Sequence, residues 1–446
     1  MHSWRSYTIR ELVGSPISGT RPAGGVSEDT EGVPSLGGEN ILSNGGVVYD
    51  GVKRITRAFF RSMPKGHLLP RDVLINKDGA QTGKVGIYDG RFDEAAVNEH
   101  LFILRSSNGV IDQRLLYYYL LSPAAQRDIT RRITGSAQPG LNSQFVDACR
   151  VSIPTNDIEQ QLIAEILTTI DDAIVHTEAL IVKTQSIKAG LMNDLFTRGV
   201  TPEGKLRPPR EEAPELYKQS PLGWVPKEWT SATFEELLAR RVILDIQDGN
   251  HGELHPKRED FLPEGVPFLM AADLSGGAID FDHCARITQK QYDGLRIGFA
   301  TGGDILLSHK GSIGETALVP FDIHHVMLTP QVTYYRVRQG LQLVPDFLLY
   351  WMRNSFFQSR MKNLAAQSTR DYVGISAQKK LLGIVLPDPS EQEVICAMAA
   401  SCQAKLDTEV GSLAKLQEIK RGLMPDLLTG RVRVPLPAEA RETASA

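Results

Sequence analysis

One candidate for phosphate binding is a segment with two glycines and a lysine, Gly79-Ala80-Gln81-Thr82-Gly83-Lys84. It looks like a phosphate-binding loop, but that motif needs four residues between its glycines and a Ser or Thr after the lysine. Here three residues intervene, and Val85 follows the lysine. A related segment, Gly311-Ser312-Ile313-Gly314-Glu315, has no lysine. Both segments predict tight turns between strands, and neither predicts a nucleotide site.

Two histidine pairs are candidate metal ligands. In His251-Gly252-Glu253-Leu254-His255 no third ligand is evident, and Gly252 and Pro256 oppose the helix that carries such pairs in zinc proteases. His324-His325 precedes the apolar run 326–328, and we expect it at a strand edge. A loop for hydrogen-bonded recognition, or an inert surface loop, fits residues 250–258 better than a metal site.

The remaining sequence offers no catalytic motif. No G-x-S-x-G elbow, cysteine–histidine motif or carboxylate-rich metal motif stands out. The four cysteines (Cys149, Cys284, Cys396 and Cys402) are scattered without C-x-x-C spacing, which argues against disulfides or a thiolate zinc site and fits a reducing compartment. We therefore expect a chain that is not an enzyme and that binds no metal or cofactor itself.

Charge is distributed by region, although the 446 residues carry a formal net charge of only −4. Residues 51–134 contain 14 Lys and Arg against 8 Asp and Glu, and residues 279–380 contain 12 against 8. Residues 155–185 contain six acidic residues and Lys183 alone as a base. Two basic modules separated by an acidic segment are typical of a protein that reads two half-sites on one DNA duplex.

Candidate DNA contacts are basic, amide, imidazole and hydroxyl side chains in the loops of these modules, because such groups bind phosphates and base edges. An inert solvated surface is the alternative. The predicted contacts are Arg54, Arg57, Arg61, Lys77, Gln81, Lys84, Asn250, His251, His255, Lys257, His309, Lys310, Ser312 and Arg370.

An internal duplication organises the elements that carry these residues. Asp72-Val73-Leu74-Ile75 returns as Asp304-Ile305-Leu306-Leu307, Glu159-Gln160 returns as Glu391-Gln392, and the run 187–195 returns as 419–427, all 232 positions apart. Gly32-Val33-Pro34 returns as Gly265-Val266-Pro267 at a spacing of 233. Blocks that keep one spacing over most of the chain predict two related halves.

Each half ends in a long helix. Apolar residues recur at helical spacing in the first half and again 232 positions later, which predicts two helices that pair as an antiparallel coiled coil. Two independent core helices are the alternative. The apolar positions are Ile163, Leu167, Ile170, Ile174, Ile181, Ile187, Leu191 and Leu195, matched by Ile395, Ala399, Cys402, Leu406, Leu413, Ile419, Leu423 and Leu427.

The rest of each half mixes strands with a helix. Residues 73–75, 85–88, 101–104, 305–307 and 332–335 are typical of strands, and 115–133 and 347–364 of helices. The fold class is therefore α/β (mixed α+β) with a pseudo-twofold duplication. The predicted segments are a first module (1–154), a first helix (155–198), a Pro-rich linker (199–228), a second module (229–387), a second helix (388–430) and a disordered tail (431–446).

The location of the protein follows from its N-terminus and hydropathy. Met1 to Tyr7 is polar where a signal peptide would be apolar, and no stretch approaches the ~20 apolar residues of a membrane span. We expect a cytoplasmic protein.

Several of these features together resemble the specificity subunit of type I restriction-modification systems. They are the two dissimilar modules, the two similar helices, and the run 36–41 led by Pro34. Pro154 and Pro387 ahead of the Glu-Gln pairs complete the pattern, with the helix ends 190–197 and 422–429. The resemblance covers nearly the whole chain.

The resemblance implies two target-recognition domains that read a bipartite, asymmetric DNA site, and helices that space them and dock modification (methyltransferase) subunits, two of them in our prediction. S-adenosylmethionine for adenine methylation, and ATP and Mg for cleavage, would be held by the modification subunits and a restriction subunit. Pro425 departs from the matching Asn193 and predicts a kink or an end in the second helix.

Three other functions stay open. The nearest is a specificity subunit in a methylation-only system, and the presence of a restriction subunit would distinguish the two. A coiled-coil scaffold explains the helices but not the basic modules. A hydrolase or nuclease would need an acid or metal cluster that the sequence does not display.

Overall fold

The computed structural model describes residues 4–22, 31–106, 109–135, 139–252, 255–340, 342–367 and 371–437. The chain divides into two compact units, the first built from two segments distant in sequence and the second from one continuous segment. Unit 1 comprises Met1–Ala179 and Val410–Ala446, and unit 2 comprises Leu180–Glu409.

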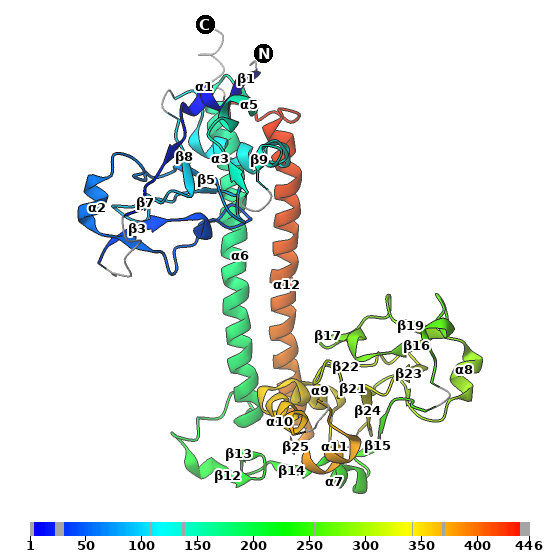
Figure 1. The fold of residues 1–446 in the computed structure, drawn as a ribbon. Helices are drawn as coiled ribbons and strands as arrows, with labels where there is room; N and C mark the ends of the chain where they lie inside the picture. Colours follow the sequence, from blue (N-terminus) through cyan, green and yellow to red (C-terminus); the bar gives the residue numbers. More distant parts are fainter. Residues whose placement is uncertain are drawn as a thin grey trace. The chain divides into compact units, whose positions relative to one another are not determined.

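Unit 1 contains short strands, short helices and part of each long helix (Figure 1). Its strands are β1 (Trp4–Thr8), β2 (Ile17–Ser18), β3 (Val33–Leu36), β4 (Arg54–Ile55), β5 (Val73–Asn76), β6 (Val85–Ile87), β7 (Ala96–Val97), β8 (Leu101–Leu104), β9 (Ile133–Thr134), β10 (Gly140–Leu141) and β11 (Arg150–Pro154). Its helices are α1 (Ile9–Val13), η1 (Gly38–Asn40), α2 (Arg57–Ser62), α3 (Gln113–Leu121), α4 (Pro123–Thr130), α5 (Phe145–Ala148) and the start of α6 (Asp157–Thr197).

Unit 2 repeats this arrangement with longer strands. Its strands are β12 (Tyr217–Ser220), β13 (Gly223–Pro226), β14 (Thr230–Thr233), β15 (Ile243–Asp248), β16 (Val266–Leu269), β17 (Leu274–Ser275), β18 (Ala278–Ile279), β19 (Ala285–Ile287), β20 (Phe299–Ala300), β21 (Ile305–Ser308), β22 (Thr316–Leu318), β23 (Val326–Leu328), β24 (Val332–Val337) and β25 (Gly383–Leu386). Its helices are η2 (Pro214–Leu216), α7 (Phe234–Ala239), η3 (Arg258–Asp260), η4 (Ala271–Asp273), α8 (Gln289–Gly294), α9 (Pro345–Arg353), α10 (Ser355–Ala366), α11 (Ile375–Leu381) and the start of α12 (Pro389–Leu428).

The two inner strands of the central sheet of each unit are buried on both faces. In unit 1 the order is β2-β8-β5-β6, and in unit 2 it is β15-β24-β21-β22. Val73 and Ile75 of β5 pack with helix α3, whereas Leu74 packs in the opposite cluster with Leu36. Because strand side chains alternate between faces, the apolar run 73–75 serves both clusters. Ile305, Leu306 and Leu307 of β21 divide in the same way.

The strands expected from the sequence are therefore present, and the mixed α/β fold class is confirmed. The duplication is visible in the hydrogen bonds as well. The side-chain Nε2 of Gln160 donates to the Val110 and Pro154 carbonyls, and that of Gln392 donates to the Gln342 and Pro387 carbonyls. These partners are all 232 or 233 positions apart.

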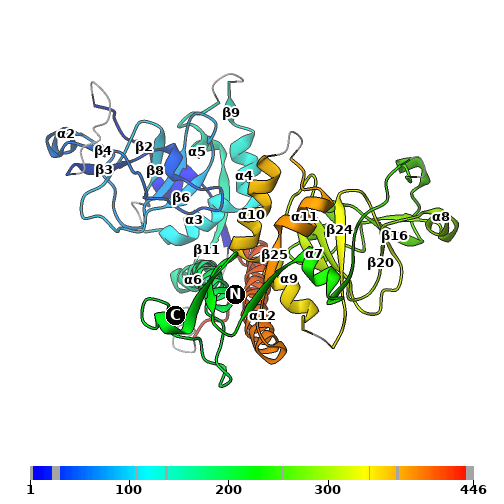
Figure 2. The same ribbon diagram turned by 90° about the horizontal axis from the view of Figure 1, so that it is seen from below.

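The long helices α6 and α12 pair antiparallel within each unit (Figures 1 and 2). In unit 1, Ile163 near the start of α6 shares a core cluster with Leu427 near the end of α12. In unit 2, Leu195 near the end of α6 shares a cluster with Ile395 near the start of α12. Polar contacts join the same helices, since Asp171 pairs with Lys420 at 2.5 Å and Thr184 Oγ1 donates to Glu409 Oε1 at 3.1 Å.

Two positions of the predicted apolar stripe do not face the helix pair. Ile187 and Ile419, which are 232 positions apart, are exposed. The sequence pattern assigns all the apolar residues to one contact surface. Contact between two helices covers only part of each helix, so some of these residues stay exposed.

Each helix predicted inside a module is broken into two. The segment 115–133 forms α3 and α4, and 347–364 forms α9 and α10. The break falls at Ser122 and at Asn354, whose side chains accept the amide N–H of Ala125 and of Phe357 as N-caps of the second helix. Capping residues favour a new helix start over an uninterrupted turn.

Pro425 does not end α12, which continues to Leu428, so the predicted helix end at this residue is wrong, and a kink there stays a prediction. Proline lacks the N–H that would bond to the carbonyl four residues earlier. Only the last turn of the helix lies beyond Pro425, and Thr429 Oγ1 donates to the Pro425 carbonyl at 2.6 Å.

The segment predicted as a disordered tail begins with residues that have fixed contacts. Arg433 donates from Nε and Nη2 to the carboxylate of Glu159, at 2.7 Å each, and Leu436 is buried. Residues 438–446 lie outside the described part of the chain. The predicted linker 199–228 includes the β12–β13 hairpin, and Arg207 within it pairs with Glu391 at 2.5 Å.

The described residues contain neither a membrane-spanning helix nor a cluster of metal ligands. No described helix has the length and apolar character to cross a bilayer. Within the same residues, His, Cys, Asp and Glu side chains nowhere gather in groups of three that could hold a metal ion.

Candidate nucleic-acid interface

The segment 77–84 is a tight turn between β5 and β6, as predicted. Its backbone is fixed by hydrogen bonds from Lys77 N to the His100 carbonyl (2.9 Å), from Gly79 N to the Pro139 carbonyl (2.9 Å) and from Gly83 N to the Asn76 carbonyl (2.7 Å). Gly79 and Gly83 have φ of 81° and 90°, which favours glycine. A phosphate loop leads from a strand into a helix, whereas this turn joins two strands.

The matched turn 309–315 of unit 2 lies between β21 and β22. His309 N donates to the Gln331 carbonyl at 2.9 Å, and Gly314 N donates to the Ser308 carbonyl at 2.9 Å. Asp78 of unit 1 forms an isolated β-bridge with Gly140, and Lys310 forms one with Tyr372. Equivalent backbones thus present different side chains in the two units.

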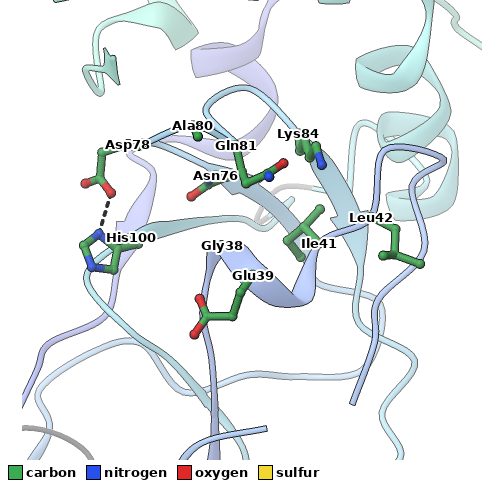
Figure 3. A pocket seen from close by; sticks show the side chains of 11 residues that line it. Gly38, Glu39, Ile41, Leu42, Asn76, Asp78, Ala80, Gln81, Lys84 and His100 are labelled. Carbon is green, nitrogen blue, oxygen red and sulfur yellow. Dashed lines mark hydrogen bonds and ion pairs between the residues drawn. The ribbon is translucent and has the colours of Figure 1, made fainter. Parts of the chain in front are cut away.

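A cleft of about 510 Å³ opens beside the turn in unit 1 (Figure 3). Carboxylate, imidazole, amide and ammonium groups surround it, together with two aliphatic side chains. Its lining is Gly38, Glu39, Ile41, Leu42, Asn76, Asp78, Gly79, Ala80, Gln81, Lys84 and His100. A second cleft of about 430 Å³, lined by Arg21, Lys53 and Asn98 among others, shares Glu39 and His100 with it. These are the donors and acceptors that read base edges.

The charges of the cleft are set by local contacts. Burial alone would raise the pKa of Glu39, but hydrogen bonds from its own backbone and from Lys53, with the positive charge of Lys53 at 3.2 Å, hold that pKa below the usual range. Asp78 hydrogen-bonds His100 Nδ1 and fixes the imidazole, as Figure 3 shows. An ionised carboxylate accepts hydrogen bonds only, so Glu39 suits the amino group of cytosine or adenine.

Three predicted contacts of unit 1 lie elsewhere. Arg54 donates to the Gly32 carbonyl at 2.7 Å, and Arg57 pairs with Glu94. Both line a separate cleft of about 520 Å³, and Arg61 is exposed on α2. The structure therefore brings Gln81 and Lys84 into the cleft of Figure 3, with Lys77 on the same turn, but not the three arginines.

The predicted contacts of unit 2 fall into two groups. His251, Lys257, Lys310 and Ser312 are exposed. By contrast, the side chain of His309 is 0% exposed and that of Asn250 is 3% exposed, so neither reaches a ligand in this conformation. The partly buried His255 hydrogen-bonds the Asn250 carbonyl through Nδ1 at 2.9 Å. Arg370 lies outside the described residues.

Burial also changes the chemistry of His309. Desolvation lowers the pKa of its imidazole to about 4, and neither ring nitrogen has a hydrogen-bond partner among the described residues. Its ring centroid lies 5.3 Å from that of Tyr372. His309 is therefore neutral at physiological pH and contributes no positive charge to the turn.

Some basic residues of the modules are structural. Arg105 pairs with the buried Asp72 at 2.5 Å, and Arg336 pairs with the buried Asp304 at 2.7 Å. Each also donates to a backbone carbonyl, of His67 and of Phe299 respectively. These pairs tie the central strands together, so the regional excess of Lys and Arg overstates the positive charge that remains for DNA.

Glu39, Asn76, Asp78 and His100 line this cleft but are not among the predicted contacts. Glu39 belongs to the run 36–41, which indicates the family and not the cleft. Asp78 and His100 meet because β5 pairs with β8, with Asn76 opposite Leu101. A strand pairing deduced from the apolar runs would have placed these two residues together.

The sequence is similar to those of known proteins over nearly the whole chain. The family model for the type I restriction modification DNA specificity domain matches residues 1–183. The specificity subunit of the type I restriction enzyme MjaVIII from Methanocaldococcus jannaschii is 23% identical over 439 residues, which are 97% of this chain and 93% of that protein. The EcoBI specificity subunit from Escherichia coli is 20% identical, over 88% of this chain and 80% of that protein.

Solved structures share the fold. The S subunit of a type I restriction-modification system from M. genitalium has a TM-score of 0.59 at 15% identity and covers 98% of this chain and 97% of its own. A chain from a structure of a type I R-M system has a TM-score of 0.55 at 16% identity and covers 95% of this chain and 97% of its own. Residues 1–183 thus match the type I restriction modification DNA specificity domain, and over nearly its whole length the chain is similar in sequence and fold to specificity subunits of type I restriction-modification systems.

Proposed function

We propose that this chain reads a bipartite, asymmetric DNA site and directs adenine methylation and ATP-dependent cleavage by partner subunits. One observation carries the bipartite site: the two units place equivalent turns on equivalent strands but equip them with different side chains. Unit 1 presents Gln81 where unit 2 presents Ile313. An amide can hydrogen-bond base edges and an aliphatic side chain cannot, so the two half-sites should differ.

The cleft of unit 1 supports direct readout. Glu39 and Asp78 accept hydrogen bonds, Lys84 donates them, and Gln81 does both. Because the carboxylates outnumber the ammonium group within the cleft, phosphates are expected at its rim and base amino groups within it. Lys84 and the exposed Lys310 are the residues we assign to the sugar-phosphate backbone in the two units.

Partner subunits have a surface to bind. Ile187 with Val182 of unit 2, and Ile419 with Val175 of unit 1, are large apolar side chains exposed on the long helices. Large apolar side chains exposed on a helix favour burial against a partner. We infer that modification subunits, two per chain, pack there, and that a restriction subunit joins the complex.

S-adenosylmethionine, ATP and Mg would act on those partners. The turns 79–84 and 311–315 do not fit ATP, because they lack the Walker A spacing and lead into strands. A cytoplasmic location is part of the same proposal. A methylation-only system remains the second candidate, and the presence of a restriction subunit distinguishes the two.

Methylation mapping tests the proposed function. The chain is co-expressed with its modification subunit, and modified adenines are mapped by single-molecule sequencing. We expect a motif of two different parts separated by a fixed gap. Robust expression of the complex without a modified motif would contradict the proposal, and a one-part motif would contradict its bipartite element.

A further inference from the structure

A groove of about 490 Å³ lies in unit 1, on a surface distinct from the cleft beside the turn. It is formed by the end of α12, the corner between α3 and α4, and strand β11. Its lining is Tyr119, Ser122, Pro123, Ala124, Ala125, Arg127, Asp128, Arg150, Val151, Ser152, Pro425, Leu428 and Thr429.

Unit 2 has a cavity at the same positions of the duplicated fold. Trp351, Asn354, Ser355, Phe356, Asn193, Phe196 and Thr197 line it, and each lies 232 positions from a residue that lines the groove of unit 1. This cavity measures only about 50 Å³. The duplication has thus produced one open groove and one nearly filled cavity.

The β12–β13 hairpin accounts for much of the difference. It brings Leu222, Trp224 and Val225 into the lining of the unit 2 cavity. Leu222 packs against the core cluster of unit 2, and Trp224 stands at the rim, 47% exposed. The groove of unit 1 has no residue of such a hairpin in its lining. Unit 2 therefore shows what this architecture accepts, namely an extended hairpin with an aliphatic and an aromatic side chain.

The rims of the two sites differ in charge. Arg127 and Arg150 border the groove of unit 1, where the matching residues of unit 2 are Ser359 and Gly383. Ala124 stands where unit 2 has the larger Phe356, which leaves more room in the groove of unit 1. Asp128 offsets part of the charge but pairs with Arg131 and Arg132 at 3.7 and 3.8 Å. An occupant of the open groove should carry apolar side chains flanked by a carboxylate.

We propose that this groove of unit 1 binds a segment of a modification subunit that presents a large aliphatic or aromatic side chain beside an acidic residue. The inference rests on the proposed function, which supplies that partner. Residues 438–446 of this chain, Ala-Glu-Ala-Arg-Glu-Thr-Ala-Ser-Ala, contain no aromatic or large aliphatic residue and do not match the chemistry of the hairpin. Burial of such a side chain in a preformed groove is typical of strong protein–protein contacts.

Cross-linking from within the groove tests the proposal. A photo-reactive p-benzoylphenylalanine replaces Ala124 in the complex of this chain with its modification subunit. We expect a cross-link to one segment of the modification subunit, located by mass spectrometry beside an aromatic or large aliphatic residue. A cross-link to residues 438–446, or none to the modification subunit, would overturn the proposal.

A blocking variant gives a second readout. Ala124→Trp should fill the groove and weaken binding of a modification subunit at least tenfold, which native mass spectrometry would detect as loss of one subunit from the complex. Thr130→Trp is the matched control, because Thr130 is exposed on the same helix but does not line the groove. If Ala124→Trp binds the modification subunit as the wild type does, the groove is not the docking site, but the proposed function stands. If the wild-type chain binds no modification subunit, the proposed function is contradicted as well.

Discussion

Lys84 and Lys310 are the residues on which the phosphate contacts of the two units depend in our proposal. Lys84 lies on the turn of unit 1, beside the cleft, and Lys310 is exposed on the turn of unit 2. Neutralising a phosphate releases a counterion, so each Lys→Ala change should weaken DNA binding by the complex and reduce the slope of log K against log salt by about 0.9. Fluorescence anisotropy at a series of salt concentrations measures both quantities.

Lys218→Ala is the control for this experiment, because Lys218 is exposed on the β12–β13 hairpin, away from the turns. It should leave the salt slope unchanged. An unchanged slope in both Lys84→Ala and Lys310→Ala would remove these residues from the set of phosphate contacts.

His309 makes the stability of unit 2 depend on pH. Its pKa is about 4 in the folded chain, because burial disfavours the imidazolium, and about 6.5 in an unfolded chain. Between these values the unfolded state binds a proton that the folded state does not, so stability falls as pH decreases from 6.5 to 4. The loss attributable to His309 between pH 7 and pH 5 is about 2 kcal/mol.

His309→Leu should remove that part of the acid sensitivity. Urea unfolding at pH 7 and pH 5, followed by tryptophan fluorescence, measures it. His251→Leu is the matched control, since that imidazole is exposed. Equal pH dependence in the His309 variant and the wild type would show that His309 becomes protonated without cost in the folded chain.

The sequence located the turns of the site but not the cleft. Gln81 and Lys84 are neighbours of two glycines and could be recognised locally. Glu39, Asp78 and His100 come together only through the pairing of β5 with β8 and the packing of η1 against Asn76, whose side-chain amide lies where a Cβ on Gly38 would be. Composition likewise could not show that His309 is buried, because its neighbours in sequence, Lys310 and Gly311, are typical of a surface turn.

At the scale of elements, apolar runs and periodicity predicted the strands and the two long helices well. These patterns can be recognised within one segment, because the order of its apolar and polar residues reflects which face is buried. The helix boundaries were less predictable. Ser122-Pro123 contains a capping residue followed by proline at the first helical position, a signal that could have separated α3 from α4. Asn354 is likewise a capping residue, but no proline follows it.

Pro425 tests how much α12 depends on its last turn. The residue costs the helix one backbone hydrogen bond but has only three helical residues after it. Pro425→Ala should restore that bond and stabilise unit 1 by about 1–2 kcal/mol, less than the ~3 kcal/mol of a mid-helix proline. The shift in thermal unfolding of unit 1 measures the gain, and Asn193→Ala at the matched position of α6 is the control.

A decrease in stability with Pro425→Ala would mean that the pyrrolidine ring itself contributes to packing. That outcome is specific, because Pro425 lines the groove of unit 1 beside Leu428. The same variant would then also weaken binding of a modification subunit in the native mass spectrometry assay.

At the scale of the whole molecule, the duplication gives the chain two units that share one scaffold. Each unit repeats the same strands, ion pairs and turn, as Asp72–Arg105 and Asp304–Arg336 illustrate. In the proposed function, a common scaffold with different turn residues would allow each unit to read its own half-site without changing the rest of the chain. Exchange of the turn residues between units should therefore alter one half of the methylated motif and leave the gap unchanged.

The gap should instead follow the length of α6 and α12. Seven residues inserted into each helix, between Ala179 and Leu180 and between Glu409 and Val410, add about 10.5 Å, or roughly three base pairs at ~3.4 Å each. Three base pairs also rotate the second half-site by roughly 100° about the duplex, since one turn takes about 10.5 base pairs. Seven residues rotate a helix by only ~20° from whole turns, so this insertion should disturb recognition.

An insertion of 25 residues in each helix avoids this mismatch. It adds about 37 Å, close to one full turn of DNA, and completes nearly seven helical turns, so both half-sites again face the protein. We expect methylation at the same two half-sites with a gap about eleven base pairs longer, measured by single-molecule sequencing. The same insertion in α6 alone should abolish methylation, because the helices could no longer pair in register. An unchanged gap with insertions in both helices would show that the linkers around the units, and not the helix pair, set the spacing.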